Sequence, residues 1–520
     1  MFTLLLISAF AVQALGRAAT WEDMKHGNFT QFIDHNDHSR GTFQQRFYWQ
    51  NVTRTGDGSP IVMIAPIEMV VTQAVGFLKG AVGTAGLLAE EMGAAAVILE
   101  HRFFGTSSPF DSLTTENLKY LTLDNVLKDI SNFARNVEFP FATESGSTAI
   151  DVPWVLAGSS WSGIQTAFTA SLAPGTFWAY YASSAPLQAI FDFWEYFVPV
   201  QQGMPQDCSS DVSALIDYMD DILLHGKKQE VDALKARFGL ETLQHNDDFM
   251  FALSMTIGNL WQNGDWKDKE YNTQHSMVDG FALWCDSIEN ATAHATSSRI
   301  EAALNGYVEF WKAFGYDYGR GYAACPDDVA DAECFNFHEP TAPQYADTSV
   351  DNLVGRQFQW ISCNEVAWWQ TGAPTGHPTL ISRLLTADYF TAQCALWFPS
   401  GPNGETYGLA KSHQVIEDIN AMTGGWNPPN TSRLIYVNNE FDPWREASVS
   451  SSFRPGGPME STEHIPIKIL PAGRHASDTY TGNARLNEGA KQVIDEVIAQ
   501  LKAWVGEWYT QKGRKIPWEA

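Results

Sequence analysis

The chain has 520 residues, of which 44% are hydrophobic and 13% aromatic, and its 60 acidic and 33 basic side chains give a formal net charge of −27. This composition excludes a disordered chain, and the length predicts two domains or one large decorated domain. The acidic excess argues against nucleic acid and anionic membranes as partners, because both are negatively charged themselves. It suits a soluble secreted protein that works in acid, although solubility alone would also explain it.

The chain opens with a segment typical of a secretory signal peptide. A largely apolar run from Phe2 to Val12 is followed by Ala14-Leu15-Gly16, which ends the segment with small residues. The segment lacks a basic start and is too short for an anchor, and no other run could span a membrane. We therefore expect cleavage of residues 1–16 and a product that is secreted or delivered to an acidic vacuolar or lysosomal compartment. Four glycosylation sequons agree with this route, at Asn28, Asn51, Asn290 and Asn430.

Continuous apolar runs in the first 190 residues predict buried strands. Helical patterns over 86–92 and 118–133 separate several of these runs. Strands that alternate with helices in this way form a parallel sheet covered on both faces, which is the α/β class. The expected strands are 42–48, 61–65, 95–99, 154–157 and 178–182.

Charged residues near three of these strands have both functional and structural interpretations. Two histidines among aspartates at 34–38 could bind a metal, but a solvated turn is favoured. Glu68 follows strand 61–65 and either lies near an active site or is a surface carboxylate. Glu100 and Arg102 follow strand 95–99, and a buried structural ion pair between them is favoured over a functional role.

A stretch rich in glycine and serine after strand 154–157 has the pattern of a nucleophile elbow. It reads Gly158-Ser159-Ser160-Trp161-Ser162-Gly163 and leads into a helix over 164–170. A serine at such a sharp turn lies exposed above the sheet, and the helix start supplies an N–H group for an oxyanion. Ser160 fits best of the three serines, because small residues stand two positions before and after it. An ordinary turn is the alternative interpretation.

The pattern changes between residues 191 and 430, where helical periodicity dominates and no buried strand run occurs. An even number of cysteines after a signal peptide indicates three disulfides, and without CxxC spacing no zinc site is expected. We therefore expect a mostly helical, disulfide-stapled cap inserted between sheet strands. Its helices are expected over 212–224, 229–238, 247–260, 298–313 and 353–359. It holds all six cysteines, Cys208, Cys285, Cys325, Cys334, Cys363 and Cys394.

The sheet resumes after the cap, so that residues 17–190 and 431–520 together form the α/β domain. Two further strands are expected over 433–438 and 465–470, and a long helix over 488–508 closes the chain. Each of these strands is followed at once by a candidate catalytic side chain.

Ser160, Asp442 and His475 each stand just past the end of an expected strand, in the chain order of the α/β-hydrolase triad. Serine is a weak nucleophile near neutral pH, so an imidazole must accept its proton. A carboxylate must hold the other ring nitrogen so that the imidazole has the correct tautomer. This chemistry needs neither a metal nor a cofactor, and we expect none.

Several short motifs outside the elbow match one known family. They are Asp34-His35, Thr42-Phe43-Gln44-Gln45-Arg46, Glu100-His101-Arg102, Tyr120-Leu121-Thr122-Leu123-Asp124, Asp442-Pro443-Trp444 and Gly473-Arg474-His475. On these motifs the chain resembles the lysosomal Pro-Xaa carboxypeptidase family of serine peptidases, and most of all its fungal acid prolyl endoprotease branch. The resemblance implies an α/β-hydrolase fold with a helical cap, and cleavage on the carboxyl side of proline. It places the nucleophile at Ser160, the base at His475 and the aspartate at Asp442.

The chain departs from the family pattern around the expected oxyanion hole, which the elbow arrangement assigns to the backbone N–H groups of Trp161 and Ile67. The family elbow reads G-G-S-Y-[GS]-G, and here Ser159 and Trp161 replace a glycine and the tyrosine. The family loop reads P-G-E, and Ile67 replaces its glycine. If Ile67 cannot adopt the backbone conformation of that glycine, the oxyanion hole is altered.

A proline ring requires a small apolar slot, for which aromatic walls are well suited. Trp444 and Trp161 are the candidate walls, with core packing as the alternative for both, and Glu68 is a further candidate substrate-binding residue. The other expected feature is the disulfide pattern, in which one pair closes a short loop and two resemble family pairings by spacing. The expected pairs are Cys208–Cys285, Cys325–Cys334 and Cys363–Cys394.

Other functions fit the same triad. A secreted esterase or lipase uses it, and a secreted binding protein could keep the fold without activity. Among peptidases, an exopeptidase of the carboxypeptidase or dipeptidyl peptidase type competes with an endopeptidase, because the shape of the cap controls access. The expected partners are proline-containing peptides or proteins. We also expect turnover in mild acid, with burial lowering the pKa of His475 and Arg474 adding to that shift.

Overall fold

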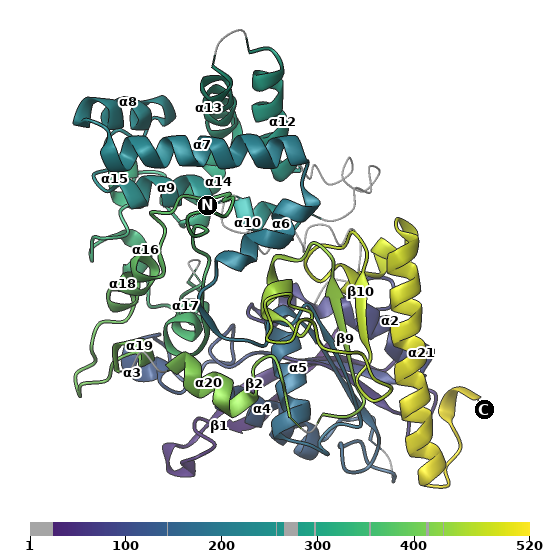
Figure 1. The fold of residues 1–520 in the computed structure, drawn as a ribbon. Coiled ribbons are helices and arrows are strands. Elements are labelled where there is room, and N and C mark those ends of the chain that lie inside the picture. The colour runs from purple at the N-terminus through teal and green to yellow at the C-terminus, as the bar shows by residue number, and fades with distance from the viewer. Residues whose placement is uncertain are drawn as a thin grey trace.

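A layer of helices covers one end of a central sheet in the computed structural model (Figure 1). The structure describes residues 24–142, 144–255, 257–264, 279–295, 298–352, 355–411, 415–429 and 431–519. The expected signal peptide at 1–16 and the sequon at Asn430 lie outside these residues. None of the helices described is both long and apolar enough to cross a bilayer.

Eight strands form the central sheet in the order β1-β2-β4-β3-β5-β6-β9-β10. β2 runs antiparallel to both of its neighbours, and the other five pairs are parallel. This is the α/β-hydrolase fold that the sequence predicts, with an antiparallel start that the expectation of a parallel sheet missed. The strands are β1 (Lys25–Phe32), β2 (Thr42–Gln50), β3 (Ile61–Ile64), β4 (Ala95–Leu99), β5 (Trp154–Ser159), β6 (Ala179–Ser183), β9 (Leu434–Asn439) and β10 (Ile467–Leu470).

Successive strand residues contribute to two hydrophobic cores, one on each face of the sheet, because side chains alternate along a strand. In β3, Met63 belongs to the core shared with α4 and α5, whereas Val62 belongs to the core shared with α2 and α21. These helices are α2 (Thr84–Glu91), α4 (Leu123–Asn136), α5 (Ser160–Leu172) and α21 (Glu488–Gln511).

The helix expected over 118–133 is wrong at its start. A short helix, α3 (Thr115–Leu118), ends there, and α4 begins five residues later at Leu123. The Thr122 hydroxyl caps α4 by accepting the N–H of Asn125 at 3.2 Å. A threonine in this position satisfies one of the unpaired N–H groups of the helix start, which fixes the beginning of α4.

The cap region is mostly helical as expected, although the helix expected over 247–260 is divided into α9 and α10, and residues 353–354 of another lie outside the described residues. It also contains a short parallel ladder. β7 (Ile190–Asp192) pairs with β8 (Ala367–Trp369), so the expectation of no strand in this region is wrong. Three residues per strand are too few to produce a periodic sequence signal. The described cap helices are α6 (Val198–Gly203), α7 (Gln206–His225), α8 (Lys228–Phe238), α9 (Asn246–Ser254), α10 (Ile257–Gln262), α12 (Gly280–Ala293), α13 (Arg299–Phe310), α14 (Tyr316–Tyr322), α15 (Asp331–Cys334), α16 (Pro343–Ala346), α17 (Arg356–Ile361), α18 (Ala387–Trp397), α19 (Gly408–Lys411) and α20 (Val415–Thr423).

The three disulfides pair as the sequence predicts. They join Cys208 to Cys285, Cys325 to Cys334 and Cys363 to Cys394. The first links α7 to α12, so it ties two cap helices whose residues are far apart in sequence. The cap boundaries at residues 191 and 430 stay a prediction.

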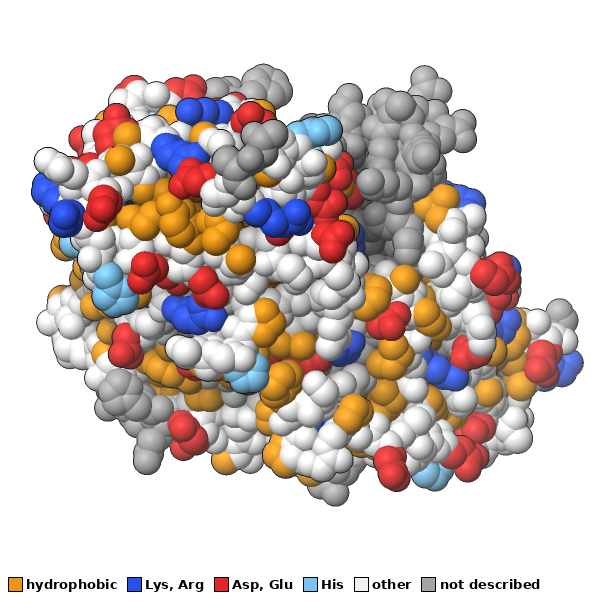
Figure 2. Space-filling model, turned by 45° about the horizontal axis from the view of Figure 1, so that its top comes forward, with side chains coloured by type: hydrophobic (Ala, Val, Ile, Leu, Met, Phe, Trp, Pro, Cys, Tyr) orange, Lys and Arg blue, Asp and Glu red, His pale blue; other side chains and the backbone are white. Residues whose placement is uncertain are grey.

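Acidic side chains are spread over the surface and mixed with basic ones on the face that Figure 2 shows. The net charge of −27 therefore acts as a diffuse field on this face rather than as one acidic patch. Among the sequons, the side chains of Asn28 and Asn290 are exposed. Asn51 is half-buried, and its Oδ1 accepts a hydrogen bond from Lys25 Nζ at 3.0 Å.

Candidate active site

The turn from β5 into α5 holds Ser160 in a strained conformation. Its φ is +55°, in the left-handed region that costs a non-glycine residue about 1–3 kcal/mol. The two glycines beside it make the turn possible, because each approaches other backbone closely. A Cβ on Gly158 would lie 2.3 Å from the Ser162 carbonyl oxygen, and one on Gly163 would lie 2.7 Å from that of Ser183. The structure thus has the sharp strand-to-helix turn that the sequence predicts.

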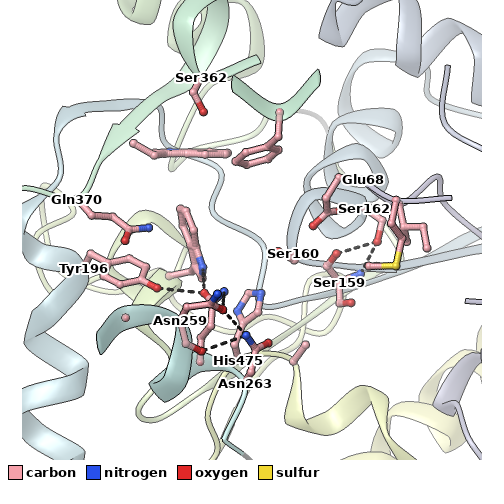
Figure 3. Close-up of a pocket in the computed structure, with 18 of the residues that line it drawn as sticks. Glu68, Ser159, Ser160, Ser162, Tyr196, Asn259, Asn263, Ser362, Gln370 and His475 are labelled. Atoms are coloured by element: carbon pink, nitrogen blue, oxygen red, sulfur yellow. Dashed lines mark hydrogen bonds between the residues drawn. The ribbon is translucent and has the colours of Figure 1, made fainter. Parts of the chain in front are cut away.

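Hydrogen bonding distinguishes the serines of this turn. Ser162 Oγ accepts the N–H of Ser159 at 3.0 Å and donates to the carbonyl oxygen of Ser159 at 2.7 Å. Ser162 is therefore committed to holding the turn, and Ser159 has an extended backbone as the last residue of β5. Ser160 is left at the strained apex and lines the central cavity (Figure 3).

His475 and Asp442 form the ion pair that the sequence predicts. His475 Nδ1 donates to Asp442 Oδ1 at 2.9 Å, and Asp442 is fully buried. The same oxygen accepts the N–H of Trp444 at 3.0 Å, which fixes the carboxylate at the start of the following turn. With its proton on Nδ1, the ring keeps Nε2 free to act as a base. His475 lines the same cavity as Ser160.

The loop that carries His475 is anchored by a buried carboxylate that the sequence analysis missed. Asp478 accepts hydrogen bonds from Tyr181 Oη at 2.5 Å, Ser183 Oγ at 2.8 Å and Asn439 Nδ2 at 3.0 Å. These donors lie on β6 and β9, so Asp478 ties the loop to the ends of both strands. Its position three residues after His475 is the one signal in the sequence that could have indicated this role.

The pKa of His475 lies above its ordinary value, contrary to the expectation from the sequence. Burial lowers the pKa, but the charge and hydrogen bond of Asp442, together with the charges of Glu68 and Asp478, raise it by more. Arg474 does not point into the cavity, because its guanidinium stacks on the Trp261 ring at 3.8 Å. The expected contribution of Arg474 to a lowered pKa therefore has no support in the structure.

Ile67 and Glu68 both line the cavity, where the sequence places them. Ile67 is not among the described non-glycine residues with positive φ, so its backbone does not require a glycine. The loop is tied to α5, because the Pro66 carbonyl oxygen accepts Gln165 Nε2 at 2.8 Å. Burial raises the pKa of Glu68, and the nearby His475 opposes this rise. The N–H groups of Ile67 and Trp161 remain the predicted oxyanion donors.

The Trp161 side chain is not a wall of the cavity, which corrects the sequence prediction. Its indole is buried in the core, and Nε1 donates to His101 Nε2 at 3.0 Å. Successive helical residues point about 100° apart, so the turn that aims Ser160 at the cavity aims Trp161 into the core. His101 in turn donates from Nδ1 to the Arg102 carbonyl oxygen at 2.8 Å. Burial lowers the pKa of His101 to about 4, which keeps Nε2 an acceptor.

The cavity has a volume of about 600 Å³ and lies between the strand ends and the cap. Trp444 lines it as expected, with its ring 6.4 Å from that of His475. Two cap residues complete an aromatic cluster, Trp368 at 5.4 Å and Tyr196 at 5.2 Å from the Trp444 ring. Trp368 and the preceding Ala367 both have positive φ, at +56° and +54°. Backbone strain at two successive residues marks a position that the surrounding structure imposes.

Gln262 joins this cluster through an amide whose orientation is fixed. Its Oε1 accepts hydrogen bonds from Tyr196 Oη at 3.0 Å and from Trp444 Nε1 at 2.9 Å. Tyr196 and Trp444 both act as donors here, so the atom of Gln262 that faces them must be the amide oxygen. The amide nitrogen therefore lies on the other side, toward Asn259 and the cavity. Among the described residues that line the cavity, Glu68 is the only acid and no lysine or arginine occurs.

The charged motifs outside the triad are structural. Glu100 binds Arg46 Nη2 at 2.6 Å, and Arg102 binds Asp129 at 2.7 Å, so the expected pair between Glu100 and Arg102 is wrong in its partners. His35 also binds Asp129, at 2.8 Å, and belongs to this buried network. The ion pairs hold the edge of the sheet and take no part in the cavity.

The chain is similar in sequence to known serine peptidases over most of its length. A model of the serine carboxypeptidase S28 family matches residues 31–486. Two serine proteases of Bipolaris victoriae (strain FI3), vicPb and vicPa, are 37% and 38% identical to the chain, and each alignment covers 94% of this chain and 90% of the relative. A probable extracellular serine carboxypeptidase of Arthroderma benhamiae is 28% identical, over 92% of this chain and 66% of its own length.

Proposed function

The chain belongs to the serine carboxypeptidase S28 family and is a serine-type peptidase, and we propose that it cleaves peptides on the carboxyl side of proline with Ser160, His475 and Asp442. One observation carries this proposal. A serine strained into a nucleophile elbow and a histidine bonded to a buried aspartate line the same cavity. We also propose that the mature protein is secreted, in agreement with the predicted signal peptide at 1–16.

The proposed mechanism follows from this geometry. His475 Nε2 removes the Ser160 Oγ proton as the oxygen attacks the carbonyl carbon of the scissile bond. The N–H groups of Trp161 and Ile67 stabilise the oxyanion of the tetrahedral intermediate. His475 then gives the proton to the leaving amine, and water repeats the sequence on the acyl-enzyme. Asp442 keeps the imidazole in the tautomer that both steps require.

The aromatic cluster of Trp444, Trp368 and Tyr196 supports proline as the residue before the scissile bond. A proline ring is compact and apolar, and the residue lacks an N–H, so aromatic faces contact it without leaving a donor unpaired. The Trp444 ring lies 6.4 Å from that of His475, so it stands beside the proposed site of reaction. The fixed amide nitrogen of Gln262 is placed to donate to a peptide carbonyl oxygen.

The charge of the cavity favours an endopeptidase over a carboxypeptidase. The described lining offers no lysine or arginine to bind a terminal carboxylate. An exopeptidase that recognises the free amino group is the second candidate, because Glu68 could bind that cation. Digestion of one long proline-containing peptide, followed by mass spectrometry, distinguishes these modes. Internal fragments indicate an endopeptidase, whereas stepwise shortening from one end indicates an exopeptidase.

The test of the active site is Ser160→Ala. We expect the variant to be secreted and folded but to lose activity by a factor on the order of a million, because covalent catalysis is removed. Activity is measured on a blocked prolyl p-nitroanilide. The corresponding alanyl amide is a comparison substrate for the proline preference, and a long-chain acyl ester is a comparison substrate for esterase activity. Retained activity in Ser160→Ala, or loss of it in Ser159→Ala alone, would assign the nucleophile elsewhere. Preference for the ester would favour an esterase.

A further inference from the structure

Two histidines and an aspartate meet on the surface of the cap, away from the cavity. His245 and Asp247 lie at the start of α9, and His338 lies in the segment after α15 (Figure 1). One ligand atom from each lies within 4.8 Å of the others. None of the three lines the active-site cavity.

The distances within this group match those of a metal centre. Without an ion, His338 Nε2 hydrogen-bonds to both carboxylate oxygens of Asp247, at 3.1 Å each. Ligand atoms bound tetrahedrally at about 2.1 Å are roughly 3.4 Å apart, which is close to this separation. The exposed His245 ring stacks on His338 with centroids 4.1 Å apart, and one of its ring nitrogens lies within 4.8 Å of the other two ligand atoms.

We propose that His245, Asp247 and His338 bind a divalent transition-metal ion of the zinc type. Two imidazoles and one carboxylate suit zinc, with water in the fourth position, whereas calcium and magnesium prefer oxygen ligands alone. From the sequence we expect no zinc site and no metal, because CxxC spacing is absent and the triad chemistry needs no ion, so this proposal departs from that expectation.

The residues beneath the site hold it in place before any ion binds. The N–H of Phe337, next to His338, donates to Asp248 Oδ2 at 3.2 Å, and the Phe337 carbonyl oxygen accepts Tyr345 Oη at 2.8 Å. Asp248 is buried and also accepts Tyr389 Oη at 2.8 Å. The main chain of His338 is thus fixed to α9 by buried partners. Such support of the ligands raises the affinity of metal sites.

The charges around the site are mixed. Asp247 and the buried Asp248 are acidic, whereas the nearby Lys235 is basic and its Nζ donates to the Leu243 carbonyl oxygen at 2.8 Å.

Binding of the ion would stiffen one wall of the substrate cavity. α9 begins at the metal site, and Phe251 and Ser254 near its other end line the cavity. An ion that binds the folded state alone also raises the melting temperature in proportion to the logarithm of its concentration.

The test uses the full-length protein without an affinity tag, treated with EDTA and titrated with Zn²⁺ at pH 7.5. We expect one ion per chain by calorimetry, and visible absorption bands of tetrahedral Co²⁺ when cobalt replaces zinc. His338→Ala and His245→Ala should each lower the affinity by at least about 10-fold. His225→Ala is the matched control, because exposed His225 pairs with Asp221 at 3.0 Å without a second histidine.

Several results would overturn the proposal. They are no saturable binding, binding that survives in both His338→Ala and His245→Ala, and equal loss in the His225→Ala control. Both ligand histidines are exposed, and circular dichroism checks that the variants are folded. Prolyl amidase activity of His338→Ala without metal should equal that of the unmodified protein, since His338 does not line the cavity.

Discussion

At the scale of single residues, the carboxylates around His475 make it a stronger base at the cost of requiring a higher pH. Asp442, Glu68 and Asp478 all favour the charged imidazolium, the form that appears when Ser160 loses its proton. The same charges keep the free imidazole protonated until the pH exceeds its raised pKa. The acid optimum expected from the sequence stays a prediction, and the charges at His475 oppose it.

Glu68→Gln tests this balance. Because His475 must be neutral to accept a proton, kcat/KM falls as the pH drops through its pKa, which we expect above about 6.5. Removing the charge of Glu68 lowers the pKa of His475 and moves the acid limb to lower pH. The measurement is the pH profile of kcat/KM on a blocked prolyl amide, with the exposed Glu463→Gln as control. An unchanged limb in Glu68→Gln would contradict the assigned coupling.

Gln262→Leu tests the role of the fixed amide. The substitution keeps the size of the side chain but removes the acceptor of Tyr196 Oη and Trp444 Nε1, and the donor that faces the cavity. We expect kcat/KM on prolyl amides to fall by about 10-fold, the effect of one or two lost hydrogen bonds. The rate at which a small fluorophosphonate labels Ser160 covalently should change little, because we expect no contact between that reagent and Gln262. Gln492→Leu on the outer helix α21 serves as the matched control.

At the scale of elements, the ends of β5, β9 and β10 place the proposed triad, and all three ends were predictable. Each strand is mostly apolar, although Lys468 interrupts β10, and the proposed catalytic residue follows each strand within a few positions. The pocket walls were less predictable. Trp368 and Tyr196 come from the cap, and only packing through β7 and β8 brings them beside Trp444. Contacts between segments so far apart leave no periodic signal in either one.

Gly158→Ala tests the elbow as an element. The added Cβ would meet the Ser162 carbonyl oxygen at 2.3 Å, and backbone on both sides of the turn would have to shift. We expect a loss of about 3 kcal/mol in the free energy of unfolding, measured by urea denaturation, and loss of activity. Gly56→Ala is the control, because nothing lies within 4 Å of its Cβ position. Equal stability of the two variants would show that the turn is not tightly packed.

At the scale of the whole molecule, acid should stabilise this chain even though it disfavours the catalytic base. Its charge of −27 repels itself near neutral pH, and the acidic side chains are dispersed rather than paired in one patch on the face of Figure 2. Burial also raises the pKa of six carboxyl groups among the described residues, and it reaches about 8 in Glu365, about 7 in Glu195 and about 6 in Asp248. These groups bind protons on folding over this range. Of the titratable groups described, only the buried His101, whose pKa burial lowers to about 4, acts strongly in the opposite direction below about pH 6.5.

The last prediction is that the melting temperature rises as the pH is lowered from 8 to 5. A carboxyl group whose pKa is raised by folding contributes stability that is complete below its unfolded pKa of about 4 and is lost as the pH rises through its folded pKa. Glu365 has the highest of these values and is buried, with both oxygens accepting the N–H of Leu123 at 2.9 Å. Glu365→Gln mimics the protonated form and keeps an acceptor for this N–H, so it should raise the melting temperature at pH 8 by about 2–4 °C and change it little at pH 5. Calorimetry over this pH range measures both effects, with the exposed Glu241→Gln as control. A melting temperature of the unmodified protein that falls below pH 7 would contradict the raised carboxyl pKa values, and with them the suitability of this fold for an acidic compartment.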